Sequence, residues 1–192
     1  ISIGGHRAGA QGAGDNHGAA VDRQGAGASA GKKSLLATWL VPGGTVGIDR
    51  HQRDPFFLYL AFFTPHVPLE SPEPWFSQTP AEAPKERRQA LAMIAAMDDG
   101  VGRIRAKLQA AGIDKNTLIF FIGDNGAPLK QGAWNGSLNL PLVGEKGMLT
   151  DGGIRTPFVA AWPGKIKAGQ VFDAPVINLD VASTAVDRKS VV

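Results

Sequence analysis

One stretch decides the fold: Thr117-Leu118-Ile119-Phe120-Phe121-Ile122-Gly123-Asp124-Asn125-Gly126. Its first half is apolar without polar alternation, which predicts a strand buried on both faces of a sheet. Asp124 and Asn125 follow just past the carboxyl end of that strand, where ligands bind in open parallel sheets. Asp-Asn-Gly is also good turn chemistry, so on its own the tripeptide predicts only a turn.

A second apolar run, residues 55–62, also ends in a polar turn, Thr64-Pro65-His66-Val67-Pro68. The region between the two runs has the pattern of one long helix. A strand, a crossover helix and a strand form a right-handed unit with both strands parallel in one sheet. The sequence therefore predicts an α/β fold, a parallel-rich sheet flanked by helices, with His66, Asp124 and Asn125 at the same edge.

The helix is predicted over residues 85–111 and ends before Gly112, a typical helix stop. Asp98 and Asp99 lie within it and flank its apolar side, so they are interpreted as a solvated face and not as a metal site. The predicted apolar stripe recurs at spacings of three and four and would pack on the sheet: Leu91, Ile94, Met97, Val101, Ile104 and Leu108.

More than thirty residues separate Asn125 from the next strand candidate, residues 157–162. Loops of that length inside compact domains are uncommon and usually functional. This one is rich in glycine, which allows close approach of the backbone to something. Lys146 lies among these glycines and is a candidate anion clamp, although a lysine taken alone is more often a surface residue.

Composition bounds the class of protein. The chain has 192 residues, 43% of them apolar, and no apolar run near the roughly 18 to 20 residues that a membrane span needs. No signal-peptide pattern opens it, and cysteine is absent, which removes disulfides and thiolate sites. The sequence pI is about 9.3. The chain has 20 basic and 17 acidic residues. Residues 1–47 contain four basic and two acidic residues, and residues 187–192 contain two basic and one acidic residue. Residues 48–186 therefore contain 14 basic and 14 acidic residues, a net charge of zero. No clustered basic face for nucleic acid is expected.

Residues 1–47 differ from the rest, since they hold 12 of the 25 glycines and almost no periodic apolar residues before Leu35. Such composition predicts disorder. Gly31-Lys32-Lys33-Ser34 is not a phosphate-binding loop, because no glycine stands five residues before Gly31 and Lys33 occupies the position that needs Ser or Thr. Asp15-Asn16-His17 has metal-binding residue types but no strand to hold them. Both are interpreted as parts of a solvated tail.

The middle of the chain resembles the carboxyl-terminal part of a sulfatase catalytic domain, in the alkaline-phosphatase-like superfamily. The resemblance covers roughly residues 48–184, and its motifs occur in the family's order. They are Pro55-Phe56-Phe57-Leu58, Pro65-His66-Val67-Pro68, Met97-Asp98-Asp99-Gly100-Val101-Gly102-Arg103-Ile104, Gly123-Asp124-Asn125-Gly126, Gly144-Glu145-Lys146-Gly147, Asp151-Gly152-Gly153-Ile154-Arg155-Thr156-Pro157, Ala161-Trp162-Pro163-Gly164 and Asn178-Leu179-Asp180.

This resemblance implies hydrolysis of sulfate esters, on a small molecule or a glycan, with a formylglycine nucleophile and a divalent cation, usually calcium. By the family's pattern, Asp124 and Asn125 would bind the cation, while His66 and Lys146 would contact the sulfate. A hard cation prefers such oxygen ligands, and the cation and the lysine would neutralise charge on the transferring group. His66 would be the general acid. Family analogy also favours a periplasmic or secreted protein.

The chain departs from the family in one decisive way. No cysteine and no Ser-x-Pro-x-Arg motif exists from which formylglycine could form, and the family's paired amino-terminal aspartates are missing. We therefore expect residues 48–186 to be a partial catalytic domain that is inactive alone and holds its metal weakly. Residues 1–47 and 187–192 are expected not to belong to the family sequence. The first segment resembles the translation of a shifted reading frame, and the second resembles a translated sequencing adapter.

Two alternatives stay open at this point. A phosphate or phosphonate ester hydrolase of the same superfamily faces the same electrostatic problem as a sulfatase. From a different class, the chain could be a non-catalytic remnant that binds a metal or an anion.

Overall fold

The computed structural model describes residues 20–21, 44–71 and 73–187. A helix spans residues 44–51. The other elements, in chain order, are β1 (Ala20–Val21), β2 (Phe56–Phe57), the 3-10 helix η1 (Phe76–Gln78), α2 (Lys85–Ala110), the 3-10 helix η2 (Asp114–Asn116), β3 (Ile119–Ile122), α3 (Asp151–Ile154), β4 (Phe158–Ala161) and α4 (Asp180–Val186).

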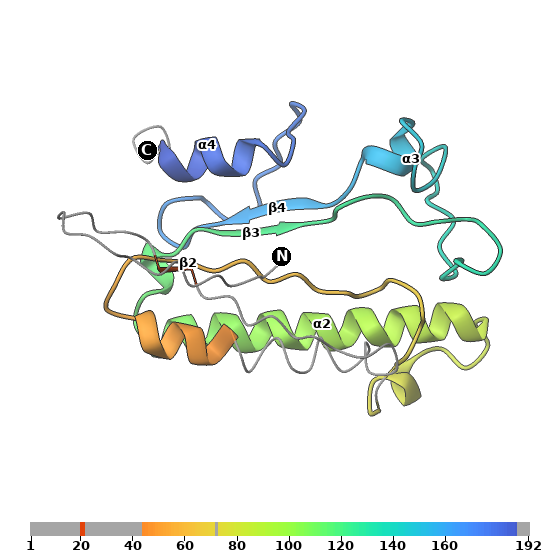
Figure 1. Ribbon diagram of the computed structural model, residues 1–192, viewed down its shortest axis with the longest axis horizontal. Coiled ribbons are helices and arrows are strands. Elements are labelled where there is room, and N and C mark those ends of the chain that lie inside the picture. Colours follow the sequence, from red (N-terminus) through yellow and green to blue (C-terminus); the bar gives the residue numbers. More distant parts are fainter. Residues whose placement is uncertain (1–19, 22–43, 72, 188–192) are drawn as a thin grey trace, which may run out of the picture.

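The elements form layers, with α2 on one side and the β3–β4 pair on the other (Figure 1). The extended chain after β2 lies between them in this view and runs in the same direction as β3. The core joins these layers, because buried Ile48 and Leu60 cluster with Ile104 and Leu108 of α2. Partly buried apolar residues pack around this cluster: Phe56, Leu58, Phe62, Ile113 and Ile119.

Both predicted strands exist, but the predicted parallel pairing between them is not shown. β2 pairs in parallel with β1, and β3 pairs with β4 in antiparallel register, with Ile119 opposite Ala161 and Ile122 opposite Phe158. Within the described residues no ladder joins β2 to β3. An apolar run indicates that a segment forms a strand. It does not specify which distant segment becomes the hydrogen-bonded partner of that strand.

The prediction that β3 is buried on both faces is wrong. All four of its residues are half-buried, and three of the four residues of β4 are exposed. The pair is held by its ladder and by an edge-to-face contact between Phe120 and Phe158, whose ring centroids are 5.9 Å apart. The predicted strand at 157–162 is confirmed as β4.

The predicted long helix is confirmed as α2, and so is its stop. Gly112 has φ of +70°, and its N–H donates to the Gln109 carbonyl while the Ile113 N–H donates to the Leu108 carbonyl. These two bonds form a Schellman motif, which needs a residue that tolerates the left-handed conformation. Glycine does so without a Cβ penalty.

The buried face of α2 differs from the predicted stripe. Ile94 is 38% exposed, and the face that packs inward also contains small residues. The buried positions are Ala90, Ala92, Met93, Ala96, Gly100, Ile104 and Leu108. Small side chains let the neighbouring backbone approach the helix, so a stripe drawn through large apolar residues alone lies off the true contact line.

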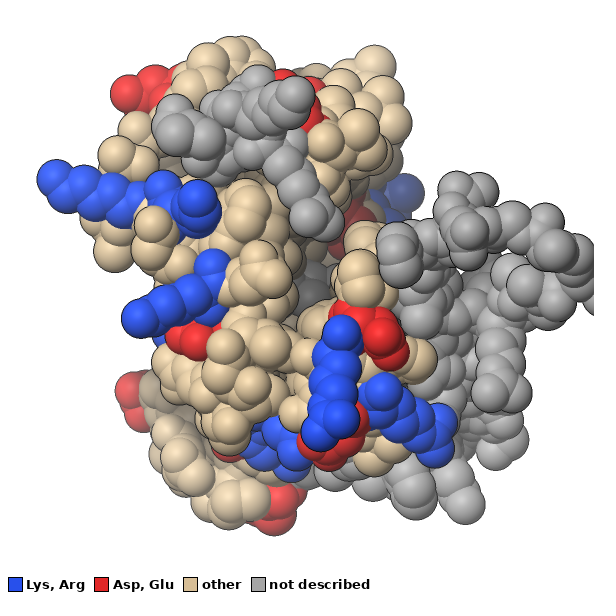
Figure 2. Space-filling model, turned by 90° about the vertical axis from the view of Figure 1, so that its left-hand side faces the viewer, with Lys and Arg blue, Asp and Glu red and all other residues tan. Residues whose placement is uncertain are grey.

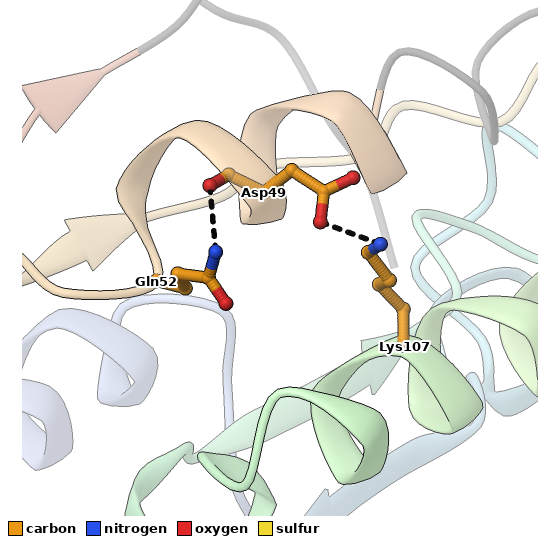
Figure 3. A network of polar contacts seen from close by, with 3 residues as sticks. All are labelled: Asp49, Gln52 and Lys107. Atoms are coloured by element: carbon orange, nitrogen blue, oxygen red, sulfur yellow. Dashed lines mark hydrogen bonds and ion pairs between the residues drawn. The ribbon is translucent and has the colours of Figure 1, made fainter.

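An ion pair fastens the helix at 44–51 to α2. Lys107 Nζ lies 2.5 Å from Asp49 Oδ1, and the Gln52 side chain donates to the Asp49 carbonyl (Figure 3). Asp98 and Asp99 are both exposed, as predicted, and Asp99 pairs with Arg103. Among the described residues, basic and acidic side chains are intermixed on the end of the molecule drawn in Figure 2.

Most of the two end segments that the sequence predicts to lie outside the domain are not described by the structure. Residues 1–19, 22–43 and 188–192 lie outside the described residues, and with them most of the predicted disordered segment and tail. Ala20–Val21, for which disorder was predicted, form β1. The predicted start of the domain at residue 48 falls inside the helix at 44–51. None of the described helices is long and apolar enough to cross a bilayer.

Candidate functional site

The loops at one end of the β3–β4 pair interlock main chain to main chain (Figure 1). Gly126 N–H donates to the Gly153 carbonyl over 2.9 Å, and Gly152 N–H donates to the Val143 carbonyl over 2.7 Å. A Cβ on Gly126 would overlap the Gly152 carbonyl, and one on Gly152 would overlap the Gly144 carbonyl. The glycines of the long loop therefore allow the loop segments to approach each other.

Asn139 fastens the same loops through its side chain. Its Nδ2 donates to the carbonyls of Ala127 (2.8 Å) and Gly144 (3.0 Å), and its Oδ1 accepts from the Ala127 N–H (3.2 Å). The residue itself has φ of +53°, a conformation that asparagine tolerates better than most residues. One side chain thus links the segment after β3 to the segment that carries Lys146.

Lys146 lies against the loop that carries Asp124 and Asn125. Its backbone N–H donates to the Ala127 carbonyl over 3.3 Å, two residues beyond Asn125. Its ammonium group forms no ion pair with any described residue. The neighbouring Glu145 carboxylate is engaged elsewhere, because it accepts from the Leu129 N–H. The lysine charge is therefore not neutralised by the acid next to it in the chain.

Asp124 and Asn125 follow β3 directly. Asp124 is exposed, and its Oδ1 accepts from the Asn125 N–H over 3.0 Å. Carboxylate and amide oxygens suit a hard cation in kind, but calcium takes about six to eight oxygens. Among the described residues no three His, Cys, Asp or Glu side chains gather closely enough to hold an ion. These two residues can therefore supply only part of a calcium shell.

His66 is exposed and has a defined orientation. Its Nδ1 lies 2.7 Å from the Val67 carbonyl, and its ring tilts against Phe63 with centroids 5.1 Å apart. A carbonyl oxygen can only accept, so Nδ1 carries the hydrogen and Nε2 is the nitrogen left for a ligand. His66 makes no hydrogen bond with Asp124, Asn125 or Lys146 in the described part of the chain.

A hollow of about 460 Å³ is lined both by the residues that follow His66 and by the loop that follows Asp124. One wall is Val67, Pro68 and Leu69, directly after His66. The others are Glu86 and Gln89 of α2, and Gln131, Gly132 and Trp134 of the loop. The residues next to His66 and a loop that follows β3 therefore face the same space.

The structure thus brings Lys146 to the loop of Asp124 and Asn125, and the His66 segment to the same end of the molecule as that loop. Sequence reasoning assigned no role to Asn139 or Trp134. Asn139 stands before Leu140-Pro141, and an asparagine next to a proline turn is a weak signal of a left-handed residue. Trp134 carries no signal beyond being an aromatic residue in a polar loop.

Comparison with known proteins gives a consistent answer. The model of the family described as Sulfatase matches residues 36–189. N-acetylgalactosamine-6-sulfatase of Rattus norvegicus is 38% identical over 120 residues, which are 62% of this chain and 22% of that protein. Arylsulfatase H of Homo sapiens is 29% identical over 161 residues, 80% of this chain and 27% of that protein. The chain spans about a fifth to a quarter of the length of these relatives.

Solved structures agree with the sequence relatives. A crystal structure of Ps i-CgsB in complex with k-i-k-neocarrahexaose superposes with a TM-score of 0.70 at 35% identity, covering 77% of this chain and 32% of that one. The family match begins twelve residues before the domain start predicted at residue 48 and reaches three residues into the segment predicted as a tail.

Proposed function

Because this chain belongs to the sulfatase family, we propose that it is the carboxyl-terminal part of the catalytic domain of an enzyme that hydrolyses sulfate esters of glycans. The observation that carries the proposal is the pairing of Lys146 with the Asp124–Asn125 loop through the Lys146 N–H bond to Ala127. A glycan is the favoured substrate because one relative is an N-acetylgalactosamine-6-sulfatase and one structural neighbour holds a carrageenan oligosaccharide.

Lys146 and His66 would divide the work on the ester. The unneutralised ammonium group of Lys146 would bind sulfate oxygens and offset the charge that builds up on the transferring group. His66, with Nδ1 committed to the Val67 carbonyl, would present Nε2. In its protonated form Nε2 would give its proton to the leaving oxygen as the S–O bond breaks.

Asp124 and Asn125 would supply the oxygen ligands that this chain contributes to a divalent cation, with calcium as the proposed ion. When bound, the cation would add positive charge at the sulfate. Asp124 keeps one carboxylate oxygen free of hydrogen bonds to described residues, since only Oδ1 accepts from the Asn125 N–H. The remaining ligands and the nucleophile would come from polypeptide outside this sequence.

Turnover is not expected from these 192 residues alone. The sequence contains no cysteine and no Ser-x-Pro-x-Arg motif, so no formylglycine can form in it. The purified chain should therefore leave an aryl sulfate unhydrolysed under conditions in which a complete sulfatase acts. Measurable turnover that co-purifies with the folded chain would refute this part of the proposal.

Binding provides the positive test. We expect N-acetylgalactosamine 6-sulfate to bind the purified chain and calcium to raise its melting temperature, because both would bind the folded form only. Lys146→Ala should lower the affinity for the sulfated sugar by about 10- to 100-fold, because the variant loses a charged hydrogen bond to the sulfate. Asp124→Ala should abolish the calcium shift.

Lys130→Ala is the matched control for Lys146→Ala, since Lys130 is an exposed lysine of the same long loop. Equal losses in both variants would reduce the effect to general surface charge and contradict the role of Lys146. Competition with the corresponding sugar phosphate distinguishes a sulfatase from the related phosphate ester hydrolase. Tighter binding of the sugar phosphate than of the sugar sulfate would favour the phosphate ester hydrolase.

A further inference from the structure

The hollow beside His66 has a chemistry that differs from that of an anion site. Eight described residues line it; none of these is a lysine or an arginine, and Glu86 is the one charged residue among them. A sulfate group in this hollow would face a carboxylate without a compensating cation. The hollow is therefore unsuited to the sulfate itself, although it begins one residue after the proposed acid.

The walls combine carbon surface with planar polar groups. Val67, Pro68 and Leu69 form one apolar wall. The indole N–H of Trp134 is already committed, because it donates to the Ser137 carbonyl over 2.8 Å. What Trp134 offers to the hollow is thus the carbon surface of its rings.

The polar groups of the hollow are unengaged. The side chains of Glu86, Gln89 and Gln131 form no hydrogen bond or ion pair with any residue that the structure describes. Together they provide two carboxamides and one carboxylate, which can donate to and accept from neighbouring hydroxyl groups. Aromatic carbon surface beside such groups suits a sugar ring, which has apolar C–H faces and a rim of hydroxyls.

The loop that carries Trp134 is held in place against α2. A Cβ on Gly136, which has φ of +79°, would overlap Arg87 of the helix, and the buried Asn135 accepts from the Ser137 N–H over 3.1 Å. The Trp134 wall is therefore built before a ligand arrives, which lowers the entropy lost on binding. A volume of about 460 Å³ lies within the range of roughly 300 to 1,000 Å³ that small ligands occupy.

We infer that the hollow formed by Val67–Leu69, Glu86, Gln89, Gln131 and Trp134 binds an unsulfated sugar unit next to the sulfated one, and that Glu86 selects against a sulfate on that unit. This rests on the proposed function, because it places the ester at His66 and the rest of the glycan in the hollow. It adds a substrate class, glycans in which the sulfated unit has a neutral neighbour.

The test compares three probes on the purified 192-residue chain by calorimetry: N-acetylgalactosamine 6-sulfate, a disaccharide that extends it by one neutral sugar, and the same disaccharide sulfated on both units. The singly sulfated disaccharide should bind about tenfold tighter than the monosaccharide. Trp134→Ala should remove that advantage and leave monosaccharide binding unchanged. Trp134→Phe, which keeps the aromatic ring, should retain most of it.

Two control variants keep the result specific. Trp162→Ala removes another half-buried tryptophan whose indole donates to a backbone carbonyl, that of Lys115, and should leave all three affinities unchanged. Glu86→Gln should strengthen the doubly sulfated disaccharide severalfold, whereas Glu82→Gln, at an exposed position before α2, should not. Circular dichroism melts establish that each variant is folded.

The outcomes separate this inference from the proposed function. Equal binding of monosaccharide and disaccharide, insensitive to Trp134→Ala, would overturn the sugar subsite and leave the sulfatase proposal standing. The unsulfated disaccharide, added as a control probe, gives a further outcome. If it binds as tightly as the singly sulfated disaccharide and its binding depends on Trp134, the subsite is supported and the proposed function is contradicted. A folded chain that binds none of the three probes would contradict both.

Discussion

At the scale of single residues, Asn139 is the most informative side chain. It satisfies two carbonyls and one N–H of separate loop segments, and no other side chain of the long loop has three such bonds among the described residues. Removing a partner from part-buried backbone groups costs about 1 to 3 kcal/mol. Its contribution is therefore to the shape of the loops that carry Lys146 and Asp124.

Substitution of Asn139 should separate its bonds from its backbone conformation. Asn139→Gly tolerates the positive φ and removes only the bonds, so we expect a loss of about 1 to 3 kcal/mol in the free energy of unfolding. Asn139→Asp should lose more, because a carboxylate cannot donate to the carbonyls of Ala127 and Gly144 and also places negative charge against their oxygens. Urea unfolding measures both, and an aspartate variant as stable as the wild type would contradict the assigned bonds.

Asn139 also marks a limit of sequence reasoning. Asp124, Asn125, His66 and Lys146 could be selected from motifs because their chemistry is local to short runs of sequence. The role of Asn139 depends on Ala127 and Gly144, which lie 12 and 5 residues away, and no periodic pattern encodes such a pairing. Roles that consist of joining loops become visible only in the folded chain.

At the scale of elements, α2 shows what periodicity predicts well. Its extent and its stop at Gly112 follow from local signals, whereas its buried face was misplaced because it includes Ala96 and Gly100, which a stripe of large residues overlooks. The partner of β3 was not predictable for a related reason. The 35 residues 123–157 separate β3 from β4, and a strand pattern does not specify its partner or its direction.

Two glycines of the α2 region should respond oppositely to alanine. Gly102 lies within the helix with nothing within 4 Å of an added Cβ, so Gly102→Ala should stabilise the protein by roughly 0.5 to 1 kcal/mol. Gly112 has an equally open surrounding but φ of +70°, so Gly112→Ala should destabilise it by about 1 kcal/mol. Thermal melts of the two variants are the measurement, and shifts of the same sign would show that the helix does not end as described.

At the scale of the whole molecule, the buried apolar residues in the described part of the chain are few and lie on one side. They belong to α2, to the helix at 44–51 and to Leu60, while α4 contains no buried residue. Large apolar side chains remain exposed after β4, among them Val171 at 84% and Phe172 at 76%. Extended exposed apolar surface marks sites of association between proteins.

We therefore expect the isolated chain to self-associate as its concentration rises, and to bind a dye that reports exposed apolar surface. Sedimentation velocity across a concentration series measures the first. Phe172→Ser should reduce the association, because Phe172 is exposed and contributes carbon surface only. Tyr59→Ser is the matched control, at an exposed aromatic residue of the extended chain after β2. A chain that stays monomeric at all concentrations would contradict this expectation.

The main-chain bonds among Gly126, Val143, Gly152 and Gly153 have an evolutionary consequence. The frame of the loops depends on main-chain bonds, most of them at glycines, and on the Asn139 side chain, while the groups proposed to react are carried on the side chains of other residues. Mutation can therefore exchange Asp124 or Lys146 and leave the frame folded. A lineage built on it can lose its chemistry, or acquire a different one, one substitution at a time without passing through an unfolded ancestor.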